Sequence, residues 1–83
     1  MTWLYLFPST HDALVAEKRW EKANYPGKLR PIPRVLSSSC GLCLEAELPP
    51  GADPIQIAAE LGFEWELIVQ VQGKEYIEKY RQD

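Results

Sequence analysis

The order of apolar runs and breakers in this 83-residue chain predicts an α+β domain of ferredoxin-like βαββαβ type, with a four-stranded antiparallel sheet and two helices on one face. Three observations carry this prediction. Apolar runs and helix-capping motifs follow one another in the order strand, helix, strand, strand, helix, strand. Prolines crowd the second strand, which that topology places at a sheet edge, where missing amide donors are tolerated. The third strand alternates with period two, as a half-buried strand does.

The first strand and first helix are marked by a short apolar run and a cap. Residues 3 to 7 are aromatic and aliphatic and end at Pro8. The Ser9 hydroxyl can accept a hydrogen bond from the Asp12 amide, which predicts a helix over about residues 11 to 23. Its apolar side chains share one face, and they are Ala13, Leu14, Ala16, Trp20 and Ala23.

The second half of the chain repeats this order. Residues 28 to 33 form the proline-rich edge strand, and residues 42 to 48 the alternating one. In the alternating strand Leu42, Leu44, Ala46 and Leu48 face one side, and Cys43, Glu45 and Glu47 face the other. Asp53 and Pro54 begin a second helix that Gly62 ends, and residues 65 to 71 supply the last strand.

One domain over residues 1–72 is expected from this pattern, followed by a tail over residues 73–83. A chain of this length fits a single domain. The tail is expected to form a helical turn around Tyr76, Ile77 and Tyr80, or to fray as chain ends do.

Composition excludes several classes of protein. The net charge of −3, from 9 Lys and Arg against 12 Asp and Glu, argues against a nucleic-acid binder. Two cysteines are too few for a disulfide scaffold, and the start of the chain lacks a signal-peptide pattern. No apolar run approaches the roughly 20 residues needed to span a bilayer. A soluble cytoplasmic protein is therefore expected.

The predicted topology brings two loops together. The end of the first strand and the turn between the second and third strands lie at the same end of such a sheet. The residues that would meet there are Ser9, Thr10 and His11 at the helix start, and Arg34, Ser37, Ser38, Ser39, Cys40 and Gly41 in the turn. Helix N-terminal amides, cations and hydroxyls favour an anion, and the thiolate is the nucleophilic form of cysteine. This setting predicts that Cys40 carries chemistry.

Other interpretations of the same residues stay open. A single cysteine also occurs as a small buried apolar residue, a histidine in a first helical turn also occurs as a solvated surface group, and serine runs mark loops. Cys40 and Cys43 form a C-x-x-C pattern, but a strand follows it where a thioredoxin-like enzyme has a helix. Cys43 shares its side of that strand with Glu45 and Glu47, whose charge opposes its ionisation, so it is an accessory thiol.

No metal or cofactor is expected. A structural zinc site needs four ligands, and the chain offers two cysteines and one histidine. The sequence contains neither a phosphate-binding loop nor a dinucleotide fingerprint.

Several segments together resemble a known family. They are Phe7-Pro8-Ser9-Thr10-His11-Asp12-Ala13-Leu14, Ala16-Glu17-Lys18, Pro31-Ile32-Pro33-Arg34 and Ser37-Ser38-Ser39-Cys40-Gly41. Over roughly residues 3 to 71 the chain resembles the selenium/sulfur carrier protein-like family of small bacterial domains. The resemblance implies that Cys40 holds sulfur or selenium as a persulfide or selenopersulfide and passes it to a partner enzyme. The family usually has a small apolar residue in place of Cys43, so this chain departs from the family in offering a second thiol.

Two alternatives to a carrier remain. The first is an interaction or ligand-sensing module that pairs with a second copy or a larger enzyme through an open sheet face bearing Tyr and Trp side chains from the first and fourth strands. The second is a small dithiol oxidoreductase that uses Cys40 and Cys43. A carrier or accessory protein is favoured over a stand-alone enzyme. Its expected partners are sulfur or selenium donor and acceptor proteins, with no nucleic acid and no membrane.

Overall fold

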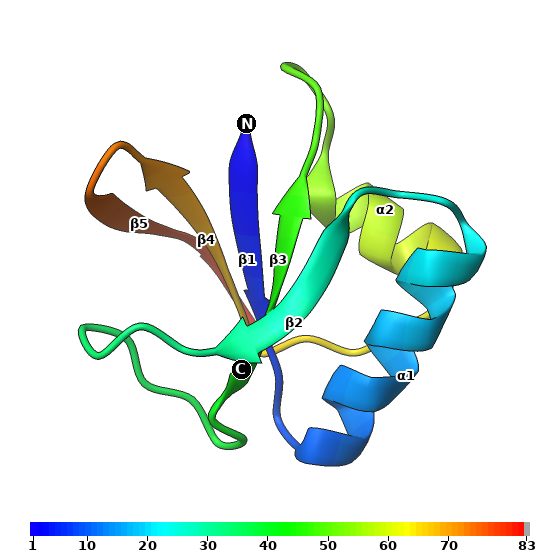
Figure 1. Cartoon of the computed structure of the whole chain (residues 1–83), viewed down its shortest axis with the longest axis horizontal. Coiled ribbons are helices and arrows are strands. Elements are labelled where there is room, and N and C mark those ends of the chain that lie inside the picture. Colours follow the sequence, from blue (N-terminus) through cyan, green and yellow to red (C-terminus); the bar gives the residue numbers. More distant parts are fainter. Residues whose placement is uncertain (83) are drawn as a thin grey trace.

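Two helices pack on one five-stranded antiparallel sheet in the computed structural model, which describes residues 1–82 (Figure 1). The elements are β1 (Thr2–Leu6), α1 (Thr10–Lys22), β2 (Gly27–Pro31), β3 (Leu42–Glu47), α2 (Pro54–Leu61), β4 (Leu67–Gln72) and β5 (Glu75–Arg81). The strand order across the sheet is β2-β3-β1-β4-β5. The predicted α+β class is confirmed, and the ferredoxin-like assignment stays a prediction.

Strand β1 lies in the middle of the sheet. It pairs with β3 on one side and with β4 on the other, so that Leu4 lies opposite both Glu45 and Val69. Its side chains alternate between the two faces of the sheet, and all of them from Trp3 to Leu6 are buried. The strand that contains Pro31 lies at an edge, as predicted, because proline has no amide to donate to a neighbouring strand.

Both helices begin at the predicted caps. The Ser9 hydroxyl accepts from the Asp12 amide at 3.1 Å, and an Asp53 carboxylate oxygen accepts from the Ile55 amide at 2.9 Å. Gly62 ends α2 in a left-handed conformation with φ of 78°. The predicted apolar face was wrong for Leu14, which is 47% exposed. The residues of α1 that are buried in the core are Ala13, Ala16 and Trp20.

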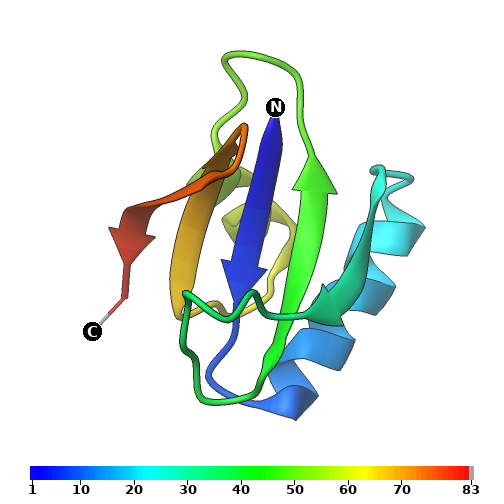
Figure 2. The same cartoon turned by 60° about the vertical axis from the view of Figure 1, so that its left-hand side comes forward.

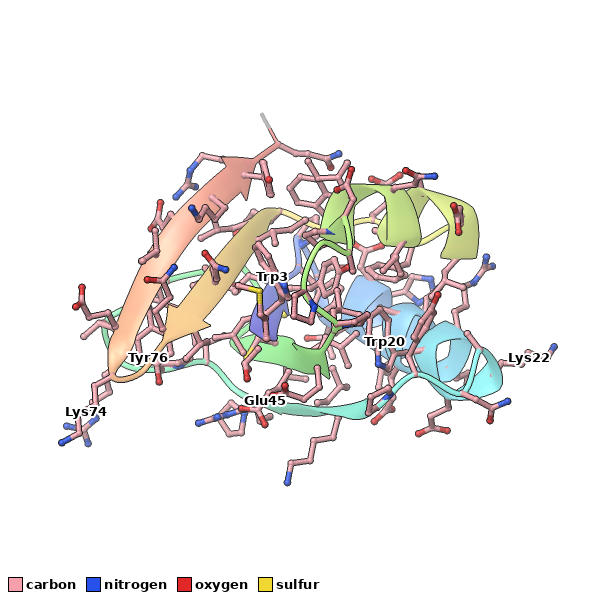
Figure 3. All side chains as sticks on the ribbon, turned by 90° about the horizontal axis from the view of Figure 1, so that it is seen from above. Trp3, Trp20, Lys22, Glu45, Lys74 and Tyr76 are labelled. Carbon is pink, nitrogen blue, oxygen red and sulfur yellow. The ribbon has the colours of Figure 1, made fainter. Side chains whose placement is uncertain are left out.

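The larger core lies between the sheet and the helices. Trp20 projects from α1 toward the sheet (Figure 3), where its ring meets Tyr5 edge-on with centroids 5.7 Å apart. Phe63, which follows α2, packs edge-on against Tyr5 at 5.1 Å. These aromatic contacts join both helices to β1.

The C-terminal residues form a fifth strand, so the predicted four-stranded sheet and the helical or frayed tail are wrong. Strand β5 pairs with β4 over its length, with Leu67 opposite Arg81 and Gln72 opposite Glu75. The pairing contains an irregularity at Ile68 and Val69. Asp83, the last residue of the predicted tail, lies outside the described residues.

The sheet face away from the helices is covered, which corrects the predicted open face. The segment 32–41 between β2 and β3 crosses this face in front of β1 (Figure 2). A second buried cluster lies beneath it and contains Leu4, Leu6, Leu36, Cys43, Leu67 and Val69, with Ile32, Val71 and Tyr76 packed against it. The aromatic side chains of β1 that were expected on an open face, Trp3 and Tyr5, belong instead to the core under the helices.

None of the helices formed by residues 1–82 is long and apolar enough to cross a membrane.

Candidate functional site

The segment that carries the predicted thiol is a closed loop, residues 32–41, called here the cysteine loop. The Ile32 amide donates to the Gly41 carbonyl at 3.1 Å, which joins the two ends of the loop. Gly41 has φ of 77°, a conformation that side chains with a Cβ rarely adopt. Leu36 is only 8% exposed and anchors the middle of the loop on the sheet. The loop is therefore a structured surface element.

Cys40 lies at the end of the cysteine loop, directly before β3. Its sulfur accepts a hydrogen bond from the Leu42 amide at 3.3 Å, and its thiol hydrogen can be donated to the Leu42 carbonyl at the same distance. The side chain is partly exposed. Cys40 thus combines partial exposure to solvent with a backbone donor and a backbone acceptor at its sulfur.

The three serines of the loop have different roles. Ser38 accepts a hydrogen bond from the Cys40 amide at 3.3 Å. Ser39 donates both its amide, at 3.3 Å, and its hydroxyl, at 2.8 Å, to the carboxylate of Glu66. Ser37 is exposed and forms no hydrogen bond through its side chain within residues 1–82. Only Ser38 and Ser39 therefore shape the surroundings of Cys40.

The helix start lies at the same end of the sheet as the cysteine loop, as Figures 1 and 2 show from two directions. Its groups are nevertheless already engaged or directed elsewhere. The Ser9 hydroxyl accepts the Asp12 amide and donates to the Asp12 carboxylate at 2.7 Å. A carboxylate thus occupies the helix N-terminus, the place where an anionic ligand would bind.

The other predicted anion-binding residues lie on the surface. Thr10, His11 and Arg34 are all exposed. A shallow hollow beside His11 is lined by α1 residues, namely His11, Leu14, Val15, Glu17 and Lys18, and Cys40 is not among them. Both hydrogen bonds of the Cys40 sulfur go to Leu42. The structure thus brings the two segments to one end of the sheet without joining His11 to the thiol.

The second thiol occupies a different environment. Cys43 is fully buried in the cluster under the cysteine loop, whereas Cys40 packs against the core on the helix side. Burial raises the pKa of the Cys43 thiol to about 11; Arg30 opposes this rise, while Glu45 and Cys40 add to it. Both cysteines are free thiols. At neutral pH Cys43 is a protonated core side chain.

Arg30 and Glu45 form an ion pair above Cys43. The Arg30 guanidinium donates to the Glu45 carboxylate at 2.5 Å across the β2–β3 pair.

Among residues 1–82, no three His, Cys, Asp or Glu side chains are arranged so that they could hold a metal ion.

Sequence reasoning missed Glu66. This residue directly precedes β4 and binds Ser39, the neighbour of Cys40. The signal was present in the predicted topology, because the antiparallel order places the start of the fourth strand at the same end of the sheet as the cysteine loop.

Residues 2–70 match the model of the family described as "Putative Se/S carrier protein-like". The chain belongs to this family. Searches of curated proteins and of solved structures each returned no match.

The Se/S carrier match includes every part of the site described above. Cys40, Cys43, Ser39 and Glu66 all lie within residues 2–70. Strand β5 begins at Glu75 and lies beyond the match. The fifth strand is thus a feature of this chain that the family match does not cover.

Proposed function

We propose that this protein is a sulfur or selenium carrier in which Cys40 holds the cargo as a persulfide or selenopersulfide. The observation that carries the proposal is the pairing of a partly exposed sulfur with a backbone donor, the Leu42 amide at 3.3 Å. Membership of the Se/S carrier family supports the same conclusion. The protein works with a donor protein and an acceptor protein and is an accessory to their reactions.

Loading is a transfer of one sulfur atom between thiols. The Cys40 thiolate attacks the terminal sulfur of a donor persulfide, R–S–SH. A new S–S bond forms at Cys40, the S–S bond of the donor breaks, and the donor leaves as the thiolate R–S⁻. Electrons balance without an external oxidant, because the transferred sulfur keeps its oxidation state. Unloading is the same step in reverse, with an acceptor thiolate attacking the terminal sulfur of the Cys40 persulfide.

The surroundings of Cys40 suit both directions of this step. A persulfide ionises more readily than a thiol, and the Leu42 amide gives the inner sulfur of a Cys40 persulfide a fixed backbone donor. The exposed Gly41 beside Cys40 leaves room for a partner backbone. Selenium, bound as Cys40–S–SeH, would occupy the same place. In the carrier reaction Cys43 takes no part, because its sulfur is fully buried and out of reach of a donor or acceptor protein.

Mass spectrometry after incubation with a small-molecule persulfide donor tests the proposal. The intact protein should gain the mass of one sulfur atom, and fragmentation should locate it on Cys40. Cys40→Ser should gain nothing. Cys43→Ala is the matched control and should load as the native chain does, since its sulfur is buried.

Two outcomes would contradict the proposal. A native chain that gains no mass does not carry sulfur on a thiol. A Cys40→Ser chain that loads as fully as the native chain places the cargo elsewhere. An intramolecular disulfide that forms reversibly during turnover would favour the dithiol oxidoreductase instead.

A further inference from the structure

The backbone of Glu66 forms hydrogen bonds with two separate parts of the chain. Its amide donates to the Leu6 carbonyl at the end of β1, at 2.6 Å, and its carbonyl accepts from the Gln82 amide at 3.0 Å. The residue thus joins the central strand to the chain just beyond β5. Its side chain therefore projects from a backbone position that the sheet fixes.

The carboxylate of Glu66 uses both oxygens on a single residue of the cysteine loop. One oxygen accepts from the Ser39 amide at 3.3 Å and the other from the Ser39 hydroxyl at 2.8 Å. Two hydrogen bonds from one residue to one carboxylate restrict both the position and the orientation of that residue. Ser39 directly precedes Cys40, so the contact restricts the backbone position from which the Cys40 side chain projects.

The cysteine loop has a separate anchor that maintains the fold. Leu36 is buried in the cluster under the loop and holds its middle on the sheet. The Ser39–Glu66 contact is exposed, and exposed charged contacts contribute little to global stability. Its effect is therefore confined to the last residues of the loop, between Ser39 and the start of β3.

We propose that Glu66 is a positioning residue for Cys40: by binding Ser39 it holds the Cys40 sulfur where the Leu42 amide reaches it, and so retains the cargo. The inference rests on the proposed carrier function for the identity of the cargo. The positional part concerns the free thiol as well, because the Leu42 donor contacts the sulfur of the unloaded chain.

Hydrogen exchange of the Leu42 amide measures this positioning without any cargo. Glu66→Ala and Ser39→Ala should each speed that exchange about threefold, the effect expected when one exposed charge-assisted contact is removed. The double variant should be no faster than either single one, since both remove the same contact. Glu66→Gln keeps an oxygen that accepts from Ser39 and should restore most of the protection. Glu64→Ala removes an exposed carboxylate two residues away and should change nothing.

The second readout is the rate at which loaded Cys40 passes its terminal sulfur to a small acceptor thiol held at a fixed concentration, with the acceptor thiolate forming the new S–S bond and Cys40 leaving as the thiolate. Glu66→Ala should lose sulfur about threefold faster than the native chain, by the same reasoning, while its midpoint of thermal unfolding stays within a few degrees of the native one. A purely structural residue would lower the midpoint and leave the loss rate of the folded fraction unchanged.

The two proposals fail in different ways. Leu42 exchange that is unchanged in both Glu66→Ala and Ser39→Ala overturns the positioning role, whether or not the chain loads sulfur. A native chain that does not load, but whose Leu42 amide responds to Glu66→Ala, overturns the carrier function and leaves the positioning role standing. If Glu66→Ala does not fold, unchanged exchange in Ser39→Ala alone overturns the positioning role.

Discussion

The buried hydroxyl of Tyr5 donates a hydrogen bond to the carbonyl oxygen of Pro54, 2.7 Å away. This bond joins the central strand β1 to the first turn of α2, 49 residues later in the chain. Burial, with the nearby charge of Asp53, raises the pKa of Tyr5 above its ordinary value, so the hydroxyl stays a donor across the physiological range.

Tyr5→Phe should therefore lower the free energy of unfolding by about 1 to 2 kcal/mol, because the Pro54 carbonyl loses a buried donor while the ring packing remains. Chemical denaturation measures the loss. Tyr25→Phe is a matched control, since Tyr25 is only partly buried and its hydroxyl makes no hydrogen bond within the described residues. Equal losses in the two variants would show that the Tyr5 hydrogen bond contributes nothing measurable to the free energy of unfolding.

The buried thiol of Cys43 predicts a loss of stability at alkaline pH. Its pKa is raised from 9.0 to about 11 in the folded chain, so the folded state holds a proton that the unfolded state releases above pH 9. The contribution of Cys43 is thus fully present below pH 9 and is lost as pH rises through 11. The loss should reach roughly 2 to 3 kcal/mol by pH 11.

Cys43→Ala isolates this contribution. The variant should be less stable than the native chain at pH 7 because it leaves a small cavity, and the difference should shrink between pH 9 and 11. Denaturation at a series of pH values measures both chains. A difference that stays constant up to pH 11 would mean that the Cys43 thiol ionises equally well in the folded and unfolded chain.

Gly27 allows a close approach of two elements. A Cβ placed there would lie 2.6 Å from the Glu45 backbone oxygen and 2.8 Å from the indole nitrogen of Trp20. Neither group is free to move, since one belongs to β3 and the other is fully buried. Gly27→Ala should cost about 2 kcal/mol or more in thermal or chemical unfolding.

Gly51→Ala is the comparison for this variant, because a Cβ at Gly51 meets no atom within 4 Å. It should cost only about 1 kcal/mol, from the positive φ of 88°. Similar costs at the two positions would mean that the packing around Gly27 yields to the added methyl group.

Strand β5 should be needed for stability although it lies beyond the family match. A chain that ends at Gln72 loses the pairing of β4 and the cover that Tyr76 gives to the second cluster. We expect a loss of about 3 kcal/mol or more in unfolding experiments, and association through the uncovered β4 edge in sedimentation. Tyr80→Ala, which removes a 39% exposed ring, should change stability by less than about 1 kcal/mol.

The local signals in the sequence were sufficient for most of the fold. Ser9 and Asp53 begin the helices because their side chains satisfy free amides, and that chemistry involves only neighbouring residues. The alternation in β3 likewise placed Cys43 on the face opposite Leu44, as the two core clusters confirm. Caps and alternation depend on short-range geometry, which a single sequence contains.

Strand β5 could not be predicted in the same way. Tyr76, Ile77 and Tyr80 have the spacing of a helix face, and the residues between them are good helix formers. The pairing steps from Ile68–Tyr80 to Val69–Glu78, so Lys79 is an extra residue that breaks the period-two pattern of a strand. Only the partner strand β4 makes this segment extended.

The sequence named Cys40 and the serines of the turn as candidate site residues, from their types and their position, and their function stays a prediction. Glu66 was missed because its contact with Ser39 joins residues 27 positions apart. The cover over the second face was missed because Ile32 and Leu36, the apolar residues that hold the loop down, were taken as part of an edge strand and a loop.

The central position of β1 in the sheet also affects how the protein folds during its synthesis on the ribosome. This most apolar strand is made first, yet its partners are residues 42–47 and 67–72. One of its edges therefore stays unpaired until β4 has left the exit tunnel, and its many distant contacts favour slow folding. Nascent chains stalled before β4 should be bound by chaperones, and the emergence of β4 should be the step at which β1 becomes sheltered.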